Sequence, residues 1–369
     1  MRVALLTYST KPRGGVVHTL ALAEALAELG AEVTVWTLGR GGDAAFFRPV
    51  AEAVTVRVVD FPGVEGEDVG DRILRSISVL GAGFAPERSS YDVVHAQDCI
   101  SANAAGPCIR TIHHLDTFTT PELAACHERA VVEPFARICV SAAVAREVEQ
   151  GWGLRPTVIG NGVEAQRFNA AAADQGGQAA WRAEIGAAYL LAVGGIEPRK
   201  GTIDLLEAYA LVRPGAPELR LVVAGGETLF DYRGYRDAFE ARAVELGVAP
   251  QVLGPVDHER LPALVAGCAA LGFVSTKEGF GLAAMEALAA GVPVVARDLP
   301  VLTEVFGPHV RYGRDPAGIA AALRTALAEG PLPGGAAFAA RHTWRAAAKA
   351  HLDFYPRALS LSKASKRLR

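Results

Sequence analysis

The chain has 369 residues, half of them hydrophobic, which suffices for one or two large domains with substantial cores. Charged residues make up 21% and the net charge is −3, so the composition offers no general attraction to nucleic acid, and no DNA-reading motif is present. The five cysteines form no Cys-x-x-Cys pair, and no apolar run reaches the ~18 residues of a membrane span, which predicts reduced thiols in a cytoplasmic protein.

The first half of the chain is a series of strand, loop and helix units. A strand at residues 2–7 is followed by a loop with Gly14 and Gly15, a helix at 17–29 and a second strand at 31–36. This order is typical of the opening of a doubly wound α/β domain. It is not the dinucleotide fingerprint, because no third glycine follows the pair at the required spacing.

The run from Arg110 to Asp116 ends a further strand, with the polar groups of His113, His114 and Asp116 at its carboxyl end. Open α/β sheets bind ligands at the carboxyl ends of their strands, so this end of the strand is a candidate site. Either histidine could serve there, with the other one exposed.

The second half repeats the pattern from residue 189 onwards, where a strand ends in Gly194 and Gly195. Lys200 follows in a short loop, and its charge would offset the negative charge of a leaving pyrophosphate. The alternative is a solvated loop charge. A phosphate loop of the Walker type is rejected, because Lys200-Gly201-Thr202 has the wrong order.

The most informative stretch runs from residue 275 to residue 296 and predicts a loop, a helix, a turn and a strand. Gly279 and Gly281 let the backbone approach a ligand closely, since neither has a Cβ. A helix is expected from Leu282 to Ala290, ended by Gly291. The free amides at its start would attract an anion such as a pyrophosphate.

Two acids, Glu278 and Glu286, flank this expected anion site. Eight positions separate them, which is at most about 12 Å along a helix and matches the reach of a nucleotide-sugar from ribose to hexose. An ionised Glu can hold a vicinal diol, because it accepts two hydrogen bonds. Spacing alone favours two charges on a surface helix. The apolar surroundings of Glu286 indicate instead a partner or a ligand.

The run Glu-Gly-Phe-Gly-Leu-x-x-x-Glu-Ala-x-x-x-Gly-x-Pro-Val-Val, which begins at Glu278, resembles the signature of the retaining glycosyltransferases of family 4 (glycosyl transferases group 1). The resemblance implies the GT-B fold, in which two doubly wound Rossmann-like domains face each other across a cleft. It also implies roles for particular residues. Glu278 and His113 would be catalytic beside the reacting sugar, and Glu286 would bind the ribose. The donor phosphates would be bound by Gly14, Gly15, Arg199, Lys200, Gly279, Phe280, Gly281 and Leu282, and the base by Val252 and Leu253.

The function implied is transfer of a sugar from a nucleotide-diphosphate-sugar to an acceptor hydroxyl, with retention of configuration. The acceptor would be a glycan, a lipid or a small molecule. No cofactor is expected, and the absence of an Asp-x-Asp triad argues against a metal-bridged donor. One departure is Gly195, where many family members have Arg. Arg199 is a candidate substitute. The alternatives are a nucleotide-sugar epimerase of the same fold and a catalytically silent nucleotide-sugar-binding protein.

The expected domain boundaries follow from these patterns. The first domain covers residues 1–165, on the acceptor side, and the second, nucleotide-sugar-binding domain covers 189–340. A linker region is expected at 166–188, because residues 170–180 are Ala, Gln and Gly with little pattern, and an exposed helix start is the alternative. A last helix at 341–356 would cross back to the first domain. The rest, 357–369, is expected to be a disordered basic tail, with weak contact to anionic lipid as the alternative.

Overall fold

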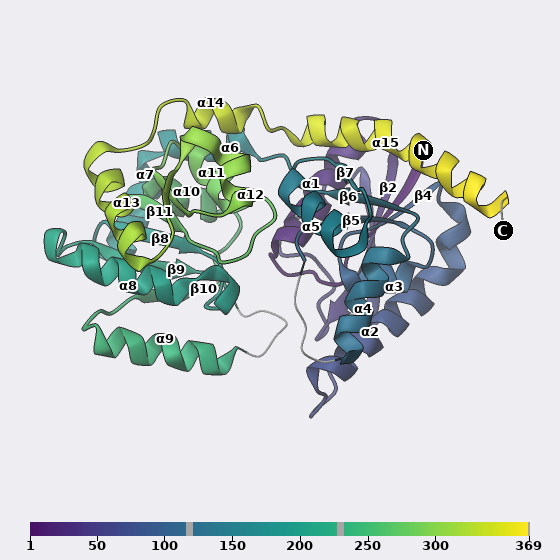
Figure 1. Cartoon of the computed structure of the whole chain (residues 1–369), viewed down its shortest axis with the longest axis horizontal. Helices are drawn as coiled ribbons and strands as arrows, with labels where there is room; N and C mark the ends of the chain where they lie inside the picture. The colour runs from purple at the N-terminus through teal and green to yellow at the C-terminus, as the bar shows by residue number, and fades with distance from the viewer. Residues whose placement is uncertain (116–120, 227–231, 368–369) are drawn as a thin grey trace. The chain divides into compact units, whose positions relative to one another are not determined.

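The structure is a computed structural model that describes residues 1–115, 121–226 and 232–367, with the side chains of the last helix described as far as residue 360. The contacts divide the chain into two compact units. The first contains Met1–Gly162 and Trp344–Arg369, and the second contains Val163–Thr343. Figure 1 labels helices and strands of both units.

The first unit is built on a parallel sheet of seven strands in the order β3-β2-β1-β4-β5-β6-β7. Its strands are β1 (Arg2–Leu6), β2 (Glu32–Arg40), β3 (Val54–Phe61), β4 (Val93–Ala96), β5 (Ile109–Ile112), β6 (Ala136–Cys139) and β7 (Thr157–Val158). Its helices are α1 (Gly14–Glu28), α2 (Val69–Phe84), α3 (Cys99–Ala105), α4 (Pro121–Val132), α5 (Ala142–Trp152) and α15 (Trp344–Arg367), with a short 3-10 turn at Ala85–Ser90.

The second unit has a six-stranded sheet in the order β10-β9-β8-β11-β12-β13, also parallel. Its strands are β8 (Tyr189–Val193), β9 (Arg220–Ala224), β10 (Gln251–Gly254), β11 (Ala270–Phe273), β12 (Val294–Arg297) and β13 (Arg311–Gly313). Its helices are α6 (Ala165–Ala173), α7 (Gln175–Ile185), α8 (Thr202–Val212), α9 (Arg233–Glu245), α10 (Leu261–Gly267), α11 (Leu282–Ala289), α12 (Pro300–Phe306), α13 (Pro316–Glu329) and α14 (Gly335–Ala340). Short 3-10 turns lie at Pro198–Lys200, Arg213–Gly215 and Gly307–His309.

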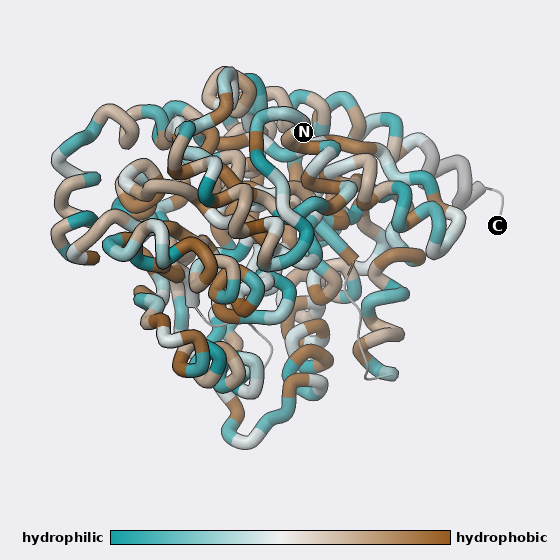
Figure 2. Tube along the Cα trace, turned by 60° about the vertical axis from the view of Figure 1, so that its left-hand side comes forward, coloured by the Kyte–Doolittle hydropathy of each residue, from teal (hydrophilic) through white to brown (hydrophobic). Residues whose placement is uncertain are grey.

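Helices cover both faces of the second sheet, and in Figure 1 its strands lie between α8 on one side and α10 and α11 on the other. In Figure 2, brown and teal segments alternate along many of the helical turns, as expected for helices that bury one face against a sheet. Most central strands are buried along their whole length, as expected for parallel sheets covered on both faces. The doubly wound architecture predicted from the sequence is confirmed.

Each sheet has one place where the strand order reverses. In the first sheet the chain builds β1, β2 and β3 outward in one direction, then returns to place β4 on the other side of β1. In the second sheet the same reversal separates β8 from β11. Ligands of open α/β sheets bind outside the carboxyl ends of the strands at such a point. The topology therefore marks the loops after β1 and β4, and after β8 and β11, before any side chain is considered.

The expected linker at 166–188 is wrong, because this segment forms α6 and α7 and belongs to the second unit. Phe168, Trp181 and Ile185 are buried and anchor the two helices, and Asp174 caps the start of α7. Small alanines between these anchors hide the helical period in the sequence. The expected disordered tail is also corrected, because the backbone of α15 continues as helix through Arg367.

Helix α15 packs on the first unit through histidine and tyrosine side chains. The Tyr355 hydroxyl lies 3.0 Å from His95 Nδ1, and His95 Nε2 lies 2.7 Å from the Thr111 hydroxyl on the neighbouring strand β5. His351 stacks in the same region, with its ring centroid 5.6 Å from that of His95. His95, His351 and Tyr355 are fully buried, so the last helix is part of the first unit's core.

Replacement of Tyr355 tests this docking. We expect Tyr355→Ala to lower the free energy of unfolding by about 3–5 kcal/mol, as for other large buried side chains, and Tyr355→Phe to cost about 1 kcal/mol through the lost hydrogen bond. Urea denaturation measures both values. Lys349→Ala, an exposed change on the same helix, is the control and should lie within about 0.5 kcal/mol of the unmutated protein. Equal effects of Tyr355→Ala and Lys349→Ala would show that α15 is not anchored in this way.

Candidate active site

The start of α11 carries the loop that the sequence singles out. Gly281 precedes the helix with φ of +101°, a left-handed conformation that other residues rarely adopt. A Cβ built at this position would lie 2.9 Å from the Phe306 ring and 3.0 Å from the Phe273 ring. No side chain caps the helix among the residues that the structure describes. The first amides of α11 are therefore free of a side-chain cap, which leaves them available to an anion.

Glu278 lies just before this helix and is bound on one side only. Its Oε1 atom accepts hydrogen bonds from Lys200 Nζ (2.7 Å), Arg199 Nη1 (3.2 Å) and the Ser275 hydroxyl (2.9 Å). No described residue donates a hydrogen bond to Oε2. A carboxylate with one saturated oxygen and one open oxygen is fixed in direction and can still accept from a ligand hydroxyl.

The charges around Glu278 set its protonation state. Burial by itself would raise the pKa of this carboxyl, but the nearby Lys200 and Arg199 outweigh it and lower the pKa to about 2. Glu197, which is buried, binds Arg199 at 3.1 Å and adds a second negative charge. The side chains of Glu278, Lys200 and Arg199 are 11%, 19% and 29% exposed, so the charged groups of this cluster are partly shielded from water.

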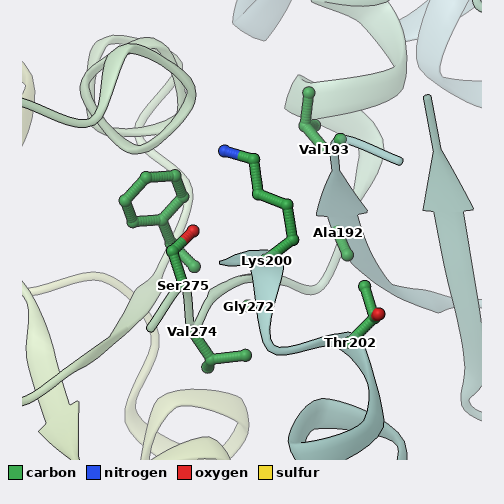
Figure 3. Close-up of a pocket in the computed structure, with 9 residues that line it drawn as sticks. Ala192, Val193, Lys200, Thr202, Gly272, Val274 and Ser275 are labelled. Carbon is green, nitrogen blue, oxygen red and sulfur yellow. The ribbon is translucent and has the colours of Figure 1, made fainter. Parts of the chain in front are cut away.

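A small pocket adjoins this cluster at the carboxyl ends of β8 and β11, the reversal point of the second sheet. Its free space of about 10 Å³ holds roughly one water molecule. Figure 3 shows the Lys200 side chain extending into it between Ser275 and Val193. The Lys200 ammonium also lies 5.5 Å from the centre of the Phe273 ring. The pocket lining comprises Ala192, Val193, Gly194, Lys200, Thr202, Gly272, Phe273, Val274 and Ser275.

Glu286 lies one turn inside α11 and differs from Glu278 in its surroundings. Burial raises its pKa to about 7, the negative charge of Glu164 adds to this, and Arg167 opposes it. No hydrogen bond to the Glu286 carboxyl is formed within the described ranges. Arg167 is instead engaged with Glu164 at 3.2 Å. A carboxyl group that has a pKa near 7, and no hydrogen bond from a described residue, is typical of a ligand-binding position.

His113 lies in the first unit, directly after β5, as the sequence predicts. Its Nε2 atom is buried and has no hydrogen-bond partner among the described residues. Burial lowers the pKa of His113 to about 3, and the neighbouring His114 and Arg110 add to this, so the ring is neutral at pH 7. A Cβ on Gly15 would lie 3.6 Å from the His113 ring, an ordinary van der Waals contact, so the glycine loop packs directly beside the imidazole.

The predicted site residues thus fall into two groups. The second unit brings together Arg199, Lys200, Glu278 and the loop from Gly279 to Leu282. Gly14, Gly15 and His113 lie together in the first unit. Among the loop residues, Phe280 offers only its backbone, because its side chain is buried. Val252 and Leu253 lie on β10, the edge strand, three strand positions or about 14 Å from β11. Asp116, noted in the sequence, lies outside the described residues.

Several contributing residues escape sequence reasoning. Ser275 sits three positions before Glu278, and only the fold shows that its hydroxyl binds the carboxylate. His18 packs edge-on against His113, with ring centroids 4.7 Å apart, and its Nδ1 lies 2.9 Å from Asn161 Oδ1. His18 lies one helical turn after Gly14 and Gly15, and this position in the sequence could have identified it as a site residue. Arg167 lies more than 100 residues from Glu286 and gives no signal at all.

Comparison with known proteins decides the family. Residues 178–350 match the family described as Glycosyl transferases group 1, and residues 12–167 match that described as Glycosyltransferase Family 4. A D-inositol 3-phosphate glycosyltransferase of Streptomyces avermitilis is 31% identical over 419 aligned positions, covering 97% of this chain and 88% of the relative. The chain belongs to the family 4 glycosyltransferases. The family membership and the enzyme class predicted from the sequence are confirmed.

Other relatives of this glycosyltransferase agree. A glycogen synthase of Mycobacterium tuberculosis is 30% identical over 368 positions, covering 89% of this chain and 86% of the relative. The solved structure of sucrose-phosphate synthase from Thermosynechococcus elongatus has the same fold, with a TM-score of 0.77 at 19% identity over 97% of this chain and 99% of that chain. The GT-B fold expected from the sequence is confirmed. No helix in the described part of the glycosyltransferase is long and apolar enough to cross a membrane.

Gly281 offers a direct test of the loop geometry. We expect Gly281→Ala to lower the free energy of unfolding by about 2–4 kcal/mol, because the left-handed conformation and the crowding by Phe306 and Phe273 add together. Gly291→Ala is the matched control, with φ of +71° but nothing within 4 Å of the added Cβ, and should cost only about 1 kcal/mol. Urea denaturation compares the two. Equal losses would mean that Gly281 is not constrained by its neighbours.

Proposed function

We propose that this glycosyltransferase moves a sugar from a nucleotide-diphosphate-sugar to an acceptor hydroxyl, with retention of configuration and without a metal ion. The observation that carries the proposal is the Glu278 carboxylate, with one oxygen bound by Lys200, Arg199 and Ser275 and the other open, next to the uncapped start of α11. A cation pair, free backbone amides and an oriented acceptor oxygen suit a diphosphate joined to a sugar.

The donor would bind in the second unit. The amides at Gly281 and Leu282 would receive the diphosphate, Lys200 and Arg199 would share its negative charge, and Glu278 Oε2 would accept from a sugar hydroxyl. Glu286, on the next turn of α11, would accept from the ribose hydroxyls, and Val252 and Leu253 would border the base through their backbone. A solved GT-B structure of Anabaena HepE, with a TM-score of 0.72 at 19% identity, is described as a complex with UDP-glucose.

Transfer breaks the bond between the anomeric carbon and the diphosphate oxygen, and forms a bond to the acceptor oxygen on the same face. The departing diphosphate gains negative charge, which Lys200, Arg199 and the helix amides stabilise, so no metal is required. A leaving phosphate oxygen can take the acceptor's proton. His113, neutral and with an open Nε2, would position the sugar or the acceptor from the first unit.

The rival functions make different predictions. Gly195, which stands where many family members have Arg, favours a silent binding protein. Arg199 weakens that argument, because it binds the same carboxylate oxygen as Lys200 and supplies a second cation. An epimerase would consume the donor at a rate independent of any acceptor. Thermal-shift screening with UDP-, GDP- and ADP-sugars would identify the base, because a bound ligand raises the melting temperature by mass action.

The role of the cluster is tested by Glu278→Ala and Lys200→Ala. We expect each to lower donor turnover by about 10²–10³-fold, the usual effect of removing one group that stabilises the transition state. Steady-state kinetics with the donor found by the thermal-shift screen measures this. Glu329→Ala removes a carboxylate that is 66% exposed in the same unit and should leave turnover unchanged. If both site variants kept near-normal turnover, the roles assigned here would be wrong.

Glu286 predicts a pH dependence of donor binding. Its pKa of about 7 means that the carboxyl is mostly protonated at pH 6 and mostly ionised at pH 8. If the ionised form binds the ribose, donor affinity should rise roughly tenfold over this range, with release of a proton on binding. Calorimetry with a nucleotide-sugar, whose diphosphate does not titrate in this range, measures both effects. Glu286→Gln should remove the pH dependence, and a pH-independent affinity in the unmutated enzyme would contradict the assignment.

A further inference from the structure

Three side chains gather where β1 and β2 end in the first unit, and we call them the Tyr8 cluster: Tyr8, Arg13 and Arg40. Arg13 Nη1 donates a hydrogen bond to the Tyr8 hydroxyl, and Arg40 Nε donates to the Tyr8 carbonyl oxygen at 3.3 Å. Both guanidinium groups also lie against the Tyr8 ring, at 5.5 Å and 5.1 Å from its centre. All three side chains are partly buried.

No carboxylate of the described residues forms an ion pair with the two arginines of this cluster. Arg13 binds the Tyr8 hydroxyl, and Arg40 binds the Tyr8 carbonyl and the Ser76 hydroxyl (2.8 Å), all of them uncharged groups. The nearby carboxylates have other hydrogen-bond or ion-pair partners. Asp43 binds Lys11 (2.7 Å) and Glu67 binds Arg75 (2.6 Å). Asp98 accepts from the backbone amides of Tyr8 (3.0 Å) and Ser101 (2.7 Å), and its charge acts on Arg40 without an ion pair between them. Arg72 adds a further positive charge that acts on Arg40.

Like charges kept together away from water are unfavourable unless an anion joins them. Burial lowers the pKa of Arg40 to about 10, and the charges of Arg13 and Arg72 contribute, while the charge of Asp98 opposes this. Arg40 therefore stays charged at pH 7. Burial raises the pKa of Tyr8, so its hydroxyl stays protonated. That hydroxyl accepts from Arg13, which leaves its own proton to donate, and no acceptor for it exists within the described residues.

The position of the cluster is that of a ligand site. Tyr8 follows β1, and Gln97 directly follows β4, its neighbour across the reversal point of the first sheet. The Gln97 side chain is 1% exposed, yet neither its nitrogen nor its oxygen has a partner in the described part of the chain. Buried amides without partners are rare and costly. Arg13 is also only two residues from Gly15, which lies against His113.

We propose that the Tyr8 cluster binds a phosphate group carried by the acceptor, so that the acceptor is a phosphorylated sugar or polyol. Two guanidinium charges match the charge of a phosphate monoester dianion, and the Tyr8 hydroxyl supplies a further donor to its third oxygen. A carboxylate would satisfy only one of the two cations. The inference deepens the proposed function and rests on it, since it names the class of acceptor for the same transfer.

Binding is tested on the full chain with inorganic phosphate and glucose 6-phosphate, followed by ³¹P NMR titration. We expect Arg40→Met and Arg13→Gln each to lower the affinity for both ligands at least tenfold. Tyr8→Phe should lower the affinity by a smaller factor. Arg155→Met, an exposed arginine of the same unit, is the control. Lys200→Ala separates this site from the donor site and should leave glucose 6-phosphate binding unchanged. Urea denaturation checks that Arg40→Met is folded. If it is not, Arg13→Gln, in the loop before α1, carries the test.

Turnover supplies the second arm, with the donor found by the thermal-shift screen. Each phosphorylated acceptor is compared with its unphosphorylated parent: glucose 6-phosphate with glucose, and inositol phosphate with inositol. Glucuronate tests whether a carboxylate can take the place of the phosphate. Arg40→Met should raise the KM for the phosphorylated acceptor at least tenfold and leave that for its parent unchanged. The inference would be overturned if phosphate binding depended on Lys200 and not on Arg13 or Arg40. It would also be overturned if the enzyme preferred the unphosphorylated acceptors or glucuronate to the phosphorylated ones. A protein that binds no nucleotide-sugar but keeps Arg40-dependent phosphate binding would overturn only the donor assignment.

Discussion

The candidate donor site depends on one buried ionic contact, in which Glu278 Oε1 is bound by Lys200, Arg199 and Ser275. A buried carboxylate is stable only if cations and hydrogen bonds replace its hydration. The three donors to Glu278 Oε1 supply this replacement, and the charges of Lys200 and Arg199 lower the pKa to about 2 against the effect of burial. The contact joins the loop after β8 to the loop after β11. These ionic contacts hold the two loops together at the reversal point of the second sheet, and they fix the start of α11 beside it.

The two units share one topology but place groups of different charge at the carboxyl ends of their strands. The second unit concentrates ionised groups at its reversal point, as a ligand with a diphosphate requires. At the end of β5, the first unit instead has neutral imidazoles, His18 and His113, whose charged forms burial disfavours. A neutral ring with an open Nε2 can donate or accept a hydrogen bond without adding charge near a sugar that becomes positive.

Sequence reasoning reached the architecture and the central motif because both rest on local patterns. Alternating apolar strands and glycine turns specify a doubly wound sheet, and the glycines around Glu278 specify the loop before α11. It failed at 166–188, where alanines conceal two helices anchored by Phe168 and Trp181. It also missed Ser275 and Arg167, because their roles depend on which segments the sheets bring together. The cations around Tyr8 are invisible for the same reason: Arg13 and Arg40 are far apart in the chain and meet only where β1 and β2 end.

The charges at Glu278 imply how donor binding and sugar recognition would be coupled. Lys200, Arg199, Glu278 and Glu197 form a balanced set of two cations and two acids. In the proposed donor complex, a diphosphate would draw Lys200 and Arg199 toward its oxygens and weaken their hold on Glu278 Oε1. The carboxylate would then need other donors, which the hydroxyls of the attached sugar could supply. A nucleoside diphosphate without a sugar leaves that need unmet, so the proposed site should discriminate for the intact donor through the same carboxylate that organises it.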